Sequence, residues 1–422
     1  MPSVFETYCS RFEVFAQQSH TPVNKNLGII ITIPCYYEPE IVRTLDSICH
    51  CAMPKCSVEI LVVVNHSESA ENDIKAFNQK TLEMLHQYAE EHATEQISIV
   101  PIAAFDIPQK QAGVGYARKV AMDEAIHRFA QINNPNGILV SCDADTLVET
   151  NYLTTIEQFY EQHPQCGAAN LYFEHPLSGE LQQEQYQAIA QYELYLRYYV
   201  EQLKRTGFPY AYHTVGSCFS VRAKTYCRQG GMNKRQAGED FYFLQKLFPS
   251  ETFGEITSTT VYPSSRVSNR VPFGTGTAIA ELKQQGGELQ TYPSESFDVL
   301  QQFFSQSLTL CNATESQLEK TYETFHPCLK SFLLFSEFKK KFIEIQHNTK
   351  SEYQFQKRFF RWFNGFQVYK FLNHSALLGF PKENVVALAA RLLQSNNNDV
   401  MALLQHYRNV QKSSNQINSV SS

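Results

Sequence analysis

The stretch LGIIITIP, from Leu27 to Pro34, is a continuous run of mostly β-branched residues that ends at a proline. A run of this kind, with no alternating polar face, is typical of a strand buried on both faces. Helical spacing follows in PEIVRTLDSIC, and a second apolar run, VEILVVVN, comes after it. Two buried strands separated by a helix predict a parallel pair joined by a crossover connection.

The alternation of strand and helix continues through the N-terminal half of the chain. After the second strand come, in order, ENDIKAFNQKTLEMLHQYAEEH, ISIVPI, GYARKVAMDEAIHRFAQI and GILVSCDAD. This order predicts an α/β unit with a mainly parallel sheet flanked by helices. Ligands of such sheets bind beyond the carboxyl ends of the strands, which is where Tyr36, Asn65, Asp143 and Asp145 lie.

Composition divides the chain further. Residues 1–26 are predicted to be an N-terminal extension with a short amphipathic helix, and residues 27–296 a domain that contains the sheet. From Phe297 onward glycine and proline thin out, and patterns such as YQFQKRFFRWFNGFQVYKFL predict a helical C-terminal region over 297–410. Residues 411–422, which end in QKSSNQINSVSS, are predicted to form a disordered tail.

Charge and hydropathy exclude some classes of protein. The chain has 422 residues, 43% of them hydrophobic, which is enough for a sizeable core. Its formal net charge of -6 gives no electrostatic reason to expect a nucleic-acid partner. No apolar run approaches the ~20 residues that span a bilayer, and the N-terminus lacks the pattern of a signal peptide. We therefore expect a cytoplasmic protein with reduced cysteines.

Two aspartates, Asp143 and Asp145, stand at the end of the fourth predicted strand in ILVSCDADTL. Carboxylates at positions i and i+2 can hold a hard cation, and Mg²⁺ and Mn²⁺ combine one or two carboxylates with phosphate oxygens. The other interpretation of the pair is a loop cap or Asx-turn without a ligand. The motif alone does not decide between the two.

Two more segments carry residue types that suit chemistry. In GVGYARKVAMDEAI, Gly113 precedes a helix that could approach a phosphate or ribose, and Arg118 could pair with a diphosphate or anchor a carboxylate. In AGEDFYFLQKLF, Glu239 and Asp240 begin a helix, where the helix dipole favours a carboxylate in any protein. The functional interpretation is a general base that removes a proton from an acceptor hydroxyl.

Taken together, six segments resemble the glycosyltransferase family 2 domain, whose members have the GT-A type nucleotide-sugar-binding fold. They cover about Leu27 to Phe248 in the family's order and spacing: IIITIPCYYEPE, EILVVVNHSES, GVGYARKVAMDEA, ILVSCDADT, VGSCFSVR and GGMNKRQAGEDF. The resemblance implies a Rossmann-like GT-A sheet over 27–296. It also implies an enzyme that moves a sugar from a nucleotide-diphosphate-sugar donor to an acceptor hydroxyl, with inversion as the expected stereochemistry.

The resemblance implies roles for residues near the nucleotide. Pro34 and Tyr36 match the end of the family's first strand, where the base packs, and Glu38 matches the acidic residue that usually follows. Asn65 stands where the family usually has an aspartate that holds the base. Because asparagine offers a donor as well as an acceptor, the preference for one base is left open.

The resemblance also implies the catalytic machinery. Arg118 matches the arginine near the base and diphosphate, and Asp143 and Asp145 match the pair that binds Mn²⁺ or Mg²⁺, with Asp145 as the more direct ligand. Asp240 matches the catalytic base of inverting members, with Glu239 as its neighbour. A histidine that serves many relatives as a further metal ligand has no clear match, and VYPSSR occupies that region.

The segment SSRVSNRVPFGTGTAI, residues 264–279, places Arg266 and Arg270 among small hydroxyl residues, close to the turn that contains Thr275. Two arginines four positions apart can clamp a phosphate or carboxylate bidentately. Our hypothesis is a flexible loop that closes on the donor diphosphate or on an anionic acceptor. The other interpretation is a polar surface loop.

Trp362, the only tryptophan, lies in the aromatic segment RFFRWFNGF. Aromatic residues at helical spacing form a core more often than a platform for a sugar. The neighbouring basic residues also permit a peripheral contact with a membrane.

Two other functions stay open. A non-catalytic binding or scaffold protein with the same fold is supported by the missing metal histidine, and it is opposed by the presence of both the Asp-Ala-Asp and Glu-Asp motifs. A sugar nucleotidyltransferase would need a glycine-rich signature with a basic residue right after the first strand, and PCYYEPE is not that signature. The sequence does not identify the acceptor, which could be a glycan, a lipid carrier or a small metabolite.

Overall fold

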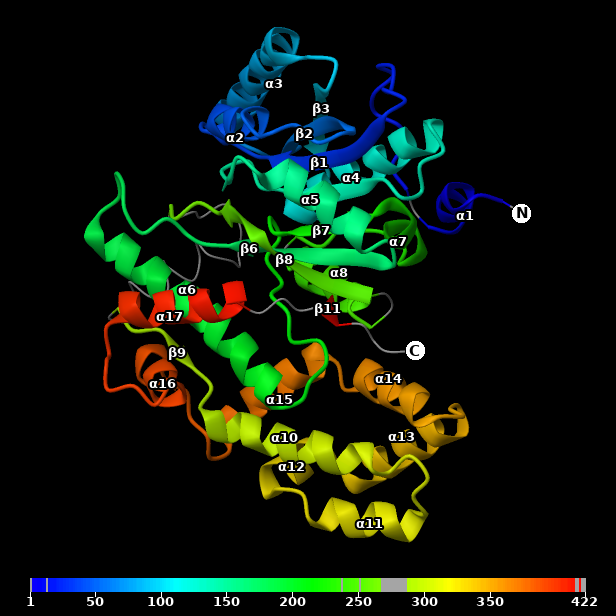
Figure 1. Ribbon diagram of the computed structural model, residues 1–422, viewed down its shortest axis with the longest axis vertical. Helices are drawn as coiled ribbons and strands as arrows, with labels where there is room; N and C mark the ends of the chain where they lie inside the picture. Colours follow the sequence, from blue (N-terminus) through cyan, green and yellow to red (C-terminus); the bar gives the residue numbers. More distant parts are fainter. Residues whose placement is uncertain are drawn as a thin grey trace. The chain divides into compact units, whose positions relative to one another are not determined.

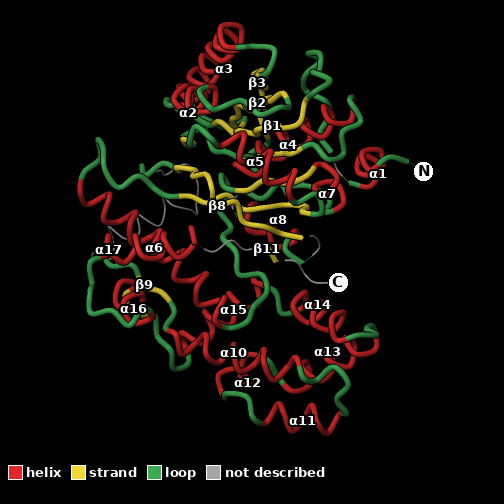
Figure 2. The backbone as a smooth tube through the Cα atoms, viewed as in Figure 1, coloured by secondary structure: helices red, strands yellow, loops and turns green. Residues whose placement is uncertain are grey.

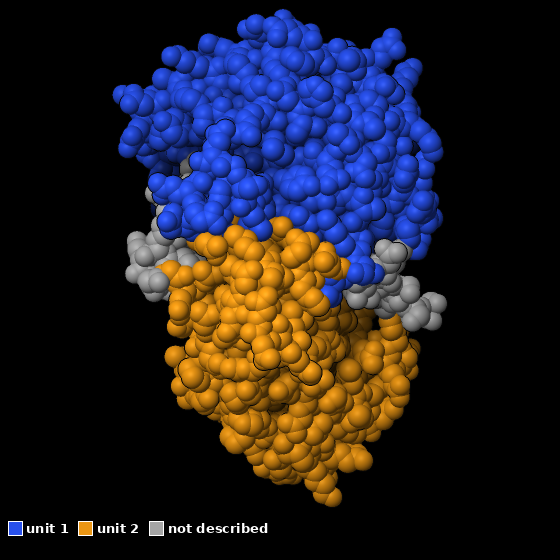
Figure 3. Space-filling view, turned by 60° about the vertical axis from the view of Figure 1, so that its left-hand side comes forward, with its two compact units in different colours: residues 1–186, 214–280, 410–422 blue, residues 187–213, 281–409 orange. Residues whose placement is uncertain are grey.

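The computed structural model describes residues 2–12, 14–236, 238–249, 252–266, 287–413 and 417–418. The chain divides into two compact units, coloured separately in Figure 3. The first comprises residues 1–186, 214–280 and 410–422, and the second comprises residues 187–213 and 281–409. Within the described ranges, no helix is both long enough and apolar enough to span a bilayer.

The described strands of the first unit form one nine-stranded sheet in the order β11-β8-β6-β7-β4-β1-β2-β3, with β5 paired to β8 (Figure 1). The strands are β1 (Leu27–Cys35), β2 (Ser57–Ser67), β3 (Ile97–Ile107), β4 (Ile138–Ser141), β5 (Leu147–Val148), β6 (Cys166–Phe173), β7 (Phe219–Arg222), β8 (Thr252–Tyr262) and β11 (Ile417–Asn418). Strands β3, β2, β1 and β4 run parallel, whereas β7 is antiparallel to β4 and β6. The predicted Rossmann-like, mainly parallel sheet is confirmed.

The β-branched run that begins at Leu27 forms β1, in the middle of the parallel part of the sheet. The side chains of Ile29, Ile31 and Ile33 are fully buried, and so is that of Ile30 on the opposite face. Burial on both faces explains why this strand lacks a polar face. The helices that precede or follow these strands are α2 (Ile41–Cys49), α3 (Asn72–His92), α4 (Val114–Gln131), α5 (Tyr152–Gln162), α7 (Ala223–Arg228) and α8 (Glu239–Leu247).

The N-terminal extension is structured, and its predicted helix is present as α1 (Val4–Arg11). Ser3 and Glu6 form a capping box at its start. The Tyr8 hydroxyl donates to the Asp123 carboxylate of α4 at 2.7 Å, and the Phe15 amide donates to the same carboxylate at 3.1 Å. The extension is therefore attached to the helix that follows β3.

The second unit is almost entirely helical (Figure 2), which confirms the predicted helical C-terminal region. A short antiparallel pair, β9 (Gln290–Thr291) with β10 (Glu383–Asn384), accompanies its helices. Phenylalanines dominate its core, because Phe303, Phe338 and Phe359 are fully buried and contact further aromatic rings. The helices are α6 (Gln183–Arg205), α10 (Ser294–Leu308), α11 (Glu315–Glu323), α12 (Pro327–Phe332), α13 (Phe335–His347), α14 (Glu352–Trp362), α15 (Gly365–Leu377), α16 (Val385–Leu392) and α17 (Val400–Ser413).

Part of the C-terminal tail pairs with the sheet. Ile417 and Asn418 lie antiparallel to Gly254 and Phe253 of β8. The sequence did not predict this pairing, because backbone hydrogen bonds to an edge strand do not depend on a side-chain pattern. The disordered tail over 411–422 stays a prediction.

Candidate functional site

The turn after β4 carries Asp143 and Asp145, and backbone contacts hold it in place. The Thr44 hydroxyl of α2 donates to the Ala144 carbonyl at 2.9 Å, and the Thr146 amide donates to the Asp143 carbonyl at 3.2 Å. The Asp143 side chain is 38% exposed and that of Asp145 is 22% exposed. Both carboxylates are therefore fixed at the carboxyl end of β4 and reachable by a ligand.

Arg118 is the hub of the site. Its buried guanidinium donates to the Asp143 carboxylate at 2.8 Å, to the Glu239 carboxylate at 3.1 Å and to the Gly216 carbonyl at 3.1 Å, and it also donates to the Ser141 hydroxyl. Burial lowers the pKa of Arg118, but the two carboxylates outweigh this effect and raise it, so the side chain stays charged. Arg118 thus anchors two carboxylates of the chain itself.

Asp240 lies at the start of α8, next to this arginine. Burial raises the pKa of its carboxyl group to about 7, helped by the negative charge of Glu239, while Arg118 acts in the opposite direction. One Asp240 oxygen accepts a hydrogen bond from the Phe241 amide at 2.7 Å. A carboxyl group with a pKa near 7 can take up and release a proton at neutral pH.

Glycine at position 216 leaves room for this arrangement. A Cβ atom on Gly216 would lie 3.0 Å from an Asp240 oxygen and 3.0 Å from a terminal nitrogen of Arg118. The backbone before β7 therefore passes directly against the acid and the arginine. A side chain here would displace one of them.

The glycines before α4 serve close packing. A Cβ atom on Gly113 would lie 2.8 Å from the Cα atom of Gln236, and one on Gly115 would lie 2.2 Å from the Arg235 carbonyl oxygen. These glycines let the start of α4 contact the loop that leads to α8. This packing brings Arg118 close to Glu239. The sequence predicted that the helix start at Gly113 could approach a phosphate or ribose, whereas in this structure Gly113 lies against the backbone of Gln236.

A second cluster surrounds Asp145. Arg266 donates to the Glu38 carboxylate at 2.9 Å and to that of Asp145 at 3.3 Å, and its guanidinium lies 3.8 Å from the Glu40 carboxylate. Arg266 thus binds carboxylates of the protein, whereas the sequence predicted that it would bind a donor or an acceptor. Arg270 and Thr275 lie outside the described residues.

The strand ends predicted to hold a nucleotide base lie side by side. Pro34 of β1 pairs with Val63 of β2, and Tyr36 follows β1 directly. Asn65, near the end of β2, is buried, and its carbonyl accepts from the Asn78 side-chain amide at 2.9 Å. The same Asn78 side chain accepts from the Tyr37 amide at 3.0 Å.

The structure gathers the predicted residues into three neighbouring groups, which are the Arg118 hub, the Arg266 cluster and the ends of β1 and β2. Sequence reasoning missed four residues that order these groups: Thr44, Asn78, Ser141 and Gly216. The last two lie inside the motifs ILVSCDADT and VGSCFSVR, which therefore contained a signal. Thr44 and Asn78 sit in ordinary helical patterns that gave none.

The two aspartates fit a hard divalent cation in the chemistry of their donor atoms. Within the described ranges, no group of three or more His, Cys, Asp or Glu side chains could hold a metal ion. A cation at Asp143 and Asp145 would therefore need phosphate oxygens and water to complete its ligands, as Mg²⁺ commonly does. Arg118 and Arg266 each pair with one of the two carboxylates.

No family model matches the chain, and neither does any curated protein sequence. Among solved structures, the chain is similar to S. aureus TarS 1-349, with 12% identity and a TM-score of 0.39 over 80% of this chain and 91% of that one. TarS 1-349 in complex with UDP-GlcNAc and with UDP gives identities of 11% and 13%, TM-scores of 0.40 and 0.39, and coverage of 80% of this chain and 91% and 92% of those chains. Similarity at this level assigns neither a family nor a ligand.

Proposed function

We propose that the chain is a metal-dependent glycosyltransferase of the family 2 type, which uses a nucleotide-diphosphate-sugar donor and inverts the anomeric carbon. The observation that carries the proposal is the Arg118 hub, in which one guanidinium binds the carboxylates of both Asp143 and Glu239. Glu239 is 121 positions away from Arg118 in the sequence. Next to it stands Asp240, with a pKa of about 7. Asp143, which would serve the donor diphosphate, and Asp240, which would deprotonate the acceptor, are therefore held close to the same arginine.

Asp240 is the general base of the proposed reaction. Its ionised carboxylate takes the proton from the acceptor hydroxyl as that oxygen forms a bond to the anomeric carbon. The bond from the anomeric carbon to the donor's phosphate oxygen breaks on the opposite face, and the nucleoside diphosphate leaves with the bonding electrons. The configuration of the sugar is inverted by this geometry.

Arg118 and the aspartate turn serve the leaving group. Asp143 and Asp145 would hold Mg²⁺ or Mn²⁺ together with the diphosphate, and the bound cation would neutralise the charge that develops on it. Arg118 fixes the Asp143 carboxylate and adds a second positive charge beside it. Arg266 must release the Asp145 carboxylate before that oxygen can bind a cation.

The proposal is tested with the purified chain and a panel of UDP-, GDP- and dTDP-sugars, with Mn²⁺ or Mg²⁺ and with chelator. We expect metal-dependent binding of one donor, lost in Asp145→Ala. Asp240→Asn should bind that donor normally but turn it over 10²- to 10⁴-fold more slowly, roughly the loss expected for a general base. Asp73→Ala, at an exposed aspartate of α3, is the matched control and should behave as wild type.

Failure to bind any donor by folded protein would overturn the proposal. Binding with no turnover in wild type would favour a non-catalytic binding protein. Release of pyrophosphate from a nucleoside triphosphate and a sugar phosphate would identify a nucleotidyltransferase.

A further inference from the structure

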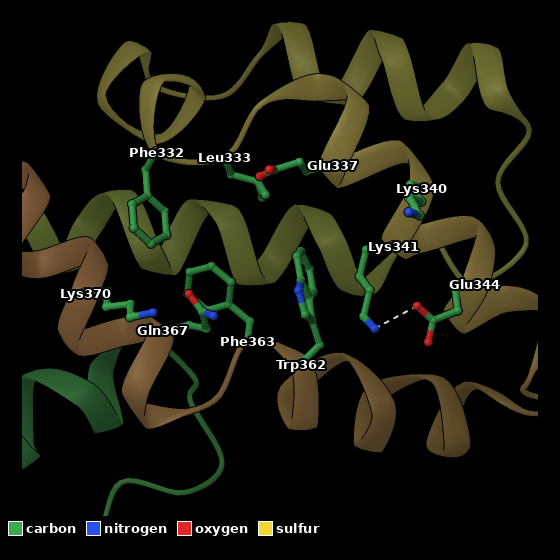
Figure 4. A pocket seen from close by; sticks show the side chains of 10 residues that line it. All are labelled: Phe332, Leu333, Glu337, Lys340, Lys341, Glu344, Trp362, Phe363, Gln367 and Lys370. Atoms are coloured by element: carbon green, nitrogen blue, oxygen red, sulfur yellow. Dashed lines mark hydrogen bonds and ion pairs between the residues drawn. The ribbon is translucent and has the colours of Figure 1, made fainter.

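A pocket on the second unit is lined by none of the residues of the groups described above. Helices α12, α13, α14 and α15 and the segments that join them surround a space of about 410 Å³. This volume is within the range of small-molecule sites, which is roughly 300–1,000 Å³. Figure 4 shows Trp362 extending between Lys370 on one side and Lys341 on the other, with Phe363 and Gln367 beside it.

The aromatic wall of the pocket is held rigidly. The Trp362 ring packs against Phe342, Phe359 and Phe363 at interplanar angles of 89°, 70° and 77°, with centroids 5.8–6.0 Å apart. Phe359 and Phe363 are buried, whereas Trp362 is only half-buried. The remaining surface of Trp362 lines the pocket. A fixed aromatic surface of this kind can pack against the apolar face of a sugar ring at little cost in side-chain entropy.

The pocket lies in the most basic part of the chain. Nine lysines and arginines and three glutamates occur between Lys330 and Lys370, although the whole chain has a formal net charge of -6. Lys340 is exposed and forms no ion pair within the described ranges. Lys370 also forms none there, and its ammonium group is held 4.5 Å from the Phe366 ring centroid. Figure 4 shows the two lysines at opposite ends of the pocket, so each offers one positive charge to an anionic group near it.

The other polar groups suit hydroxyls. The Gln367 amide can both donate and accept, and the carboxylates of Glu337 and Glu344 can accept from hydroxyl groups. Glu344 pairs with Lys341 at 2.8 Å, which leaves a carboxylate oxygen at the rim. Two carboxylates in the wall disfavour a ligand with many negative charges. The lining fits one anionic group, several hydroxyls and an apolar ring face.

We propose that this pocket binds an anionic monosaccharide unit, meaning a sugar ring that carries a single phosphate or carboxylate group. The ring packs on Trp362, the anion binds Lys370 at one end of the pocket, and the hydroxyls bond to Gln367 and Glu337. The proposal concerns the second unit alone and goes beyond the transferase reaction. It holds whether or not the first unit transfers a sugar.

Trp362 makes the test direct, because it is the only tryptophan and lines the pocket. Its fluorescence in the full chain is followed while glucose 6-phosphate, glucuronate, glucose, AMP or inorganic phosphate is added. We expect a saturable change with glucose 6-phosphate or glucuronate, with a Kd of about 1 mM or tighter. Glucose and phosphate alone should each bind at least about tenfold more weakly.

Charge-removing variants locate the site. Lys370→Gln should weaken binding of the anionic sugar about tenfold, because it removes a charged hydrogen-bond donor. Lys80→Gln, at an exposed lysine of α3 in the first unit, removes the same charge and should bind as wild type. Melting curves confirm that each variant is folded.

Three results would overturn the proposal. The first is no saturable change with either anionic sugar. The second is equal binding of glucose or of phosphate, which would show that Lys370 or the aromatic wall contributes nothing. The third is tighter binding of AMP than of glucose 6-phosphate, which would identify a nucleotide site.

Discussion

Asp240 shows how one residue couples stability to pH. Burial and Glu239 raise the pKa of its carboxyl group from 3.8 to about 7, so folding favours the protonated form. A raised acid pKa gives stability that is fully present below pH 4 and is lost as pH rises toward 7. Catalysis needs the opposite form, because only the ionised carboxylate accepts a proton. The same burial that tunes the base therefore costs stability at working pH.

The first prediction concerns Asp240→Asn, which cannot ionise. Its melting temperature should exceed that of wild type at pH 8, and the difference should shrink toward pH 4. For wild type, kcat/KM for transfer should rise with pH and level off above about 7, whereas the variant should show a low and flat profile. A melting difference that is constant from pH 4 to 8 would contradict the assignment of the raised pKa.

The second prediction concerns Gly216→Ala. The new methyl group would lie 3.0 Å from both Asp240 and Arg118, so one of them must move. Overpacking should cost about 1–3 kcal/mol in the free energy of unfolding, and displacement of the base should lower kcat about 10²-fold, as misplacement of reacting groups does. Ser217→Ala is the neighbouring control. A variant with full kcat would show that Gly216 is not needed at the site.

Local patterns were enough to single out the carboxylates but not their partners. Asp143, Asp145, Glu239 and Asp240 stand in short motifs at strand ends and at a helix start, where chemistry commonly lies. That Arg118 pairs with Asp143 and Glu239 depends on three segments far apart in sequence. Arg266 was expected to bind a ligand, but in the structure it pairs with Glu38. The sequence could not predict this pair, because it does not show which carboxylates lie near an arginine in the fold.

At the scale of elements, α4 carries charged residues whose burial its sequence does not show. In the structure Asp123 and Glu124 are fully or almost fully buried, and the N-terminal extension donates hydrogen bonds to both. The Gln18 amide donates to Glu124 at 2.7 Å, while Lys119 pairs with Asp123 at 2.8 Å. The hydrophobic periodicity and the helix propensity of its residues predict the helix. They cannot show that a segment over 100 residues away in sequence buries its charged side chains.

The third prediction follows from this cover. Deletion of residues 1–19 would remove the Tyr8, Phe15 and Gln18 donors to Asp123 and Glu124, while Lys119, Tyr226 and Arg128 remain. Each hydrogen bond to a charged group that is lost should lower the free energy of unfolding by about 1.5–3 kcal/mol. Because α4 also carries Arg118, transfer should weaken in the truncated chain. Tyr8→Phe removes one hydrogen bond to a charged group and should cost about 1.5–3 kcal/mol. Urea unfolding measures both, and an unchanged midpoint in the deletion would contradict the buried-charge account.

At the scale of the whole molecule, the division into units is discontinuous in sequence. Residues 187–213 belong with 281–409, whereas residues 410–422 belong with the first unit. The composition changes near Phe297, so it predicts a single domain boundary at that point of the sequence. Composition shows where residue types change, but it does not show which segments pack together. The buried cluster of the second unit includes Leu203 and Phe208 together with Phe304 and Phe360. Glu193 of α6 likewise pairs with Arg408 of α17 at 2.8 Å.

The fourth prediction uses a chain that ends at residue 296. It would keep Leu203 and Phe208 but lose Phe304 and Phe360, so apolar side chains that are 3–4% exposed would face water. It would also remove Arg408, one of the two arginines that pair with the buried Glu193, and removal of a partner from a buried charge is costly. We expect this fragment to aggregate or to elute as large species in size-exclusion chromatography, with reduced helical circular dichroism per residue.

The matched control for this fragment is a chain that ends at Asn418, which keeps both α17 and β11. It should elute and melt as the full chain does, because every described contact of the second unit is retained. The comparison separates the loss of the second unit's packing from a general effect of shortening the chain. A monodisperse fragment of residues 1–296 with a cooperative melt would show that residues 187–213 do not need the C-terminal helices, and that the boundary suggested by composition is also the physical one.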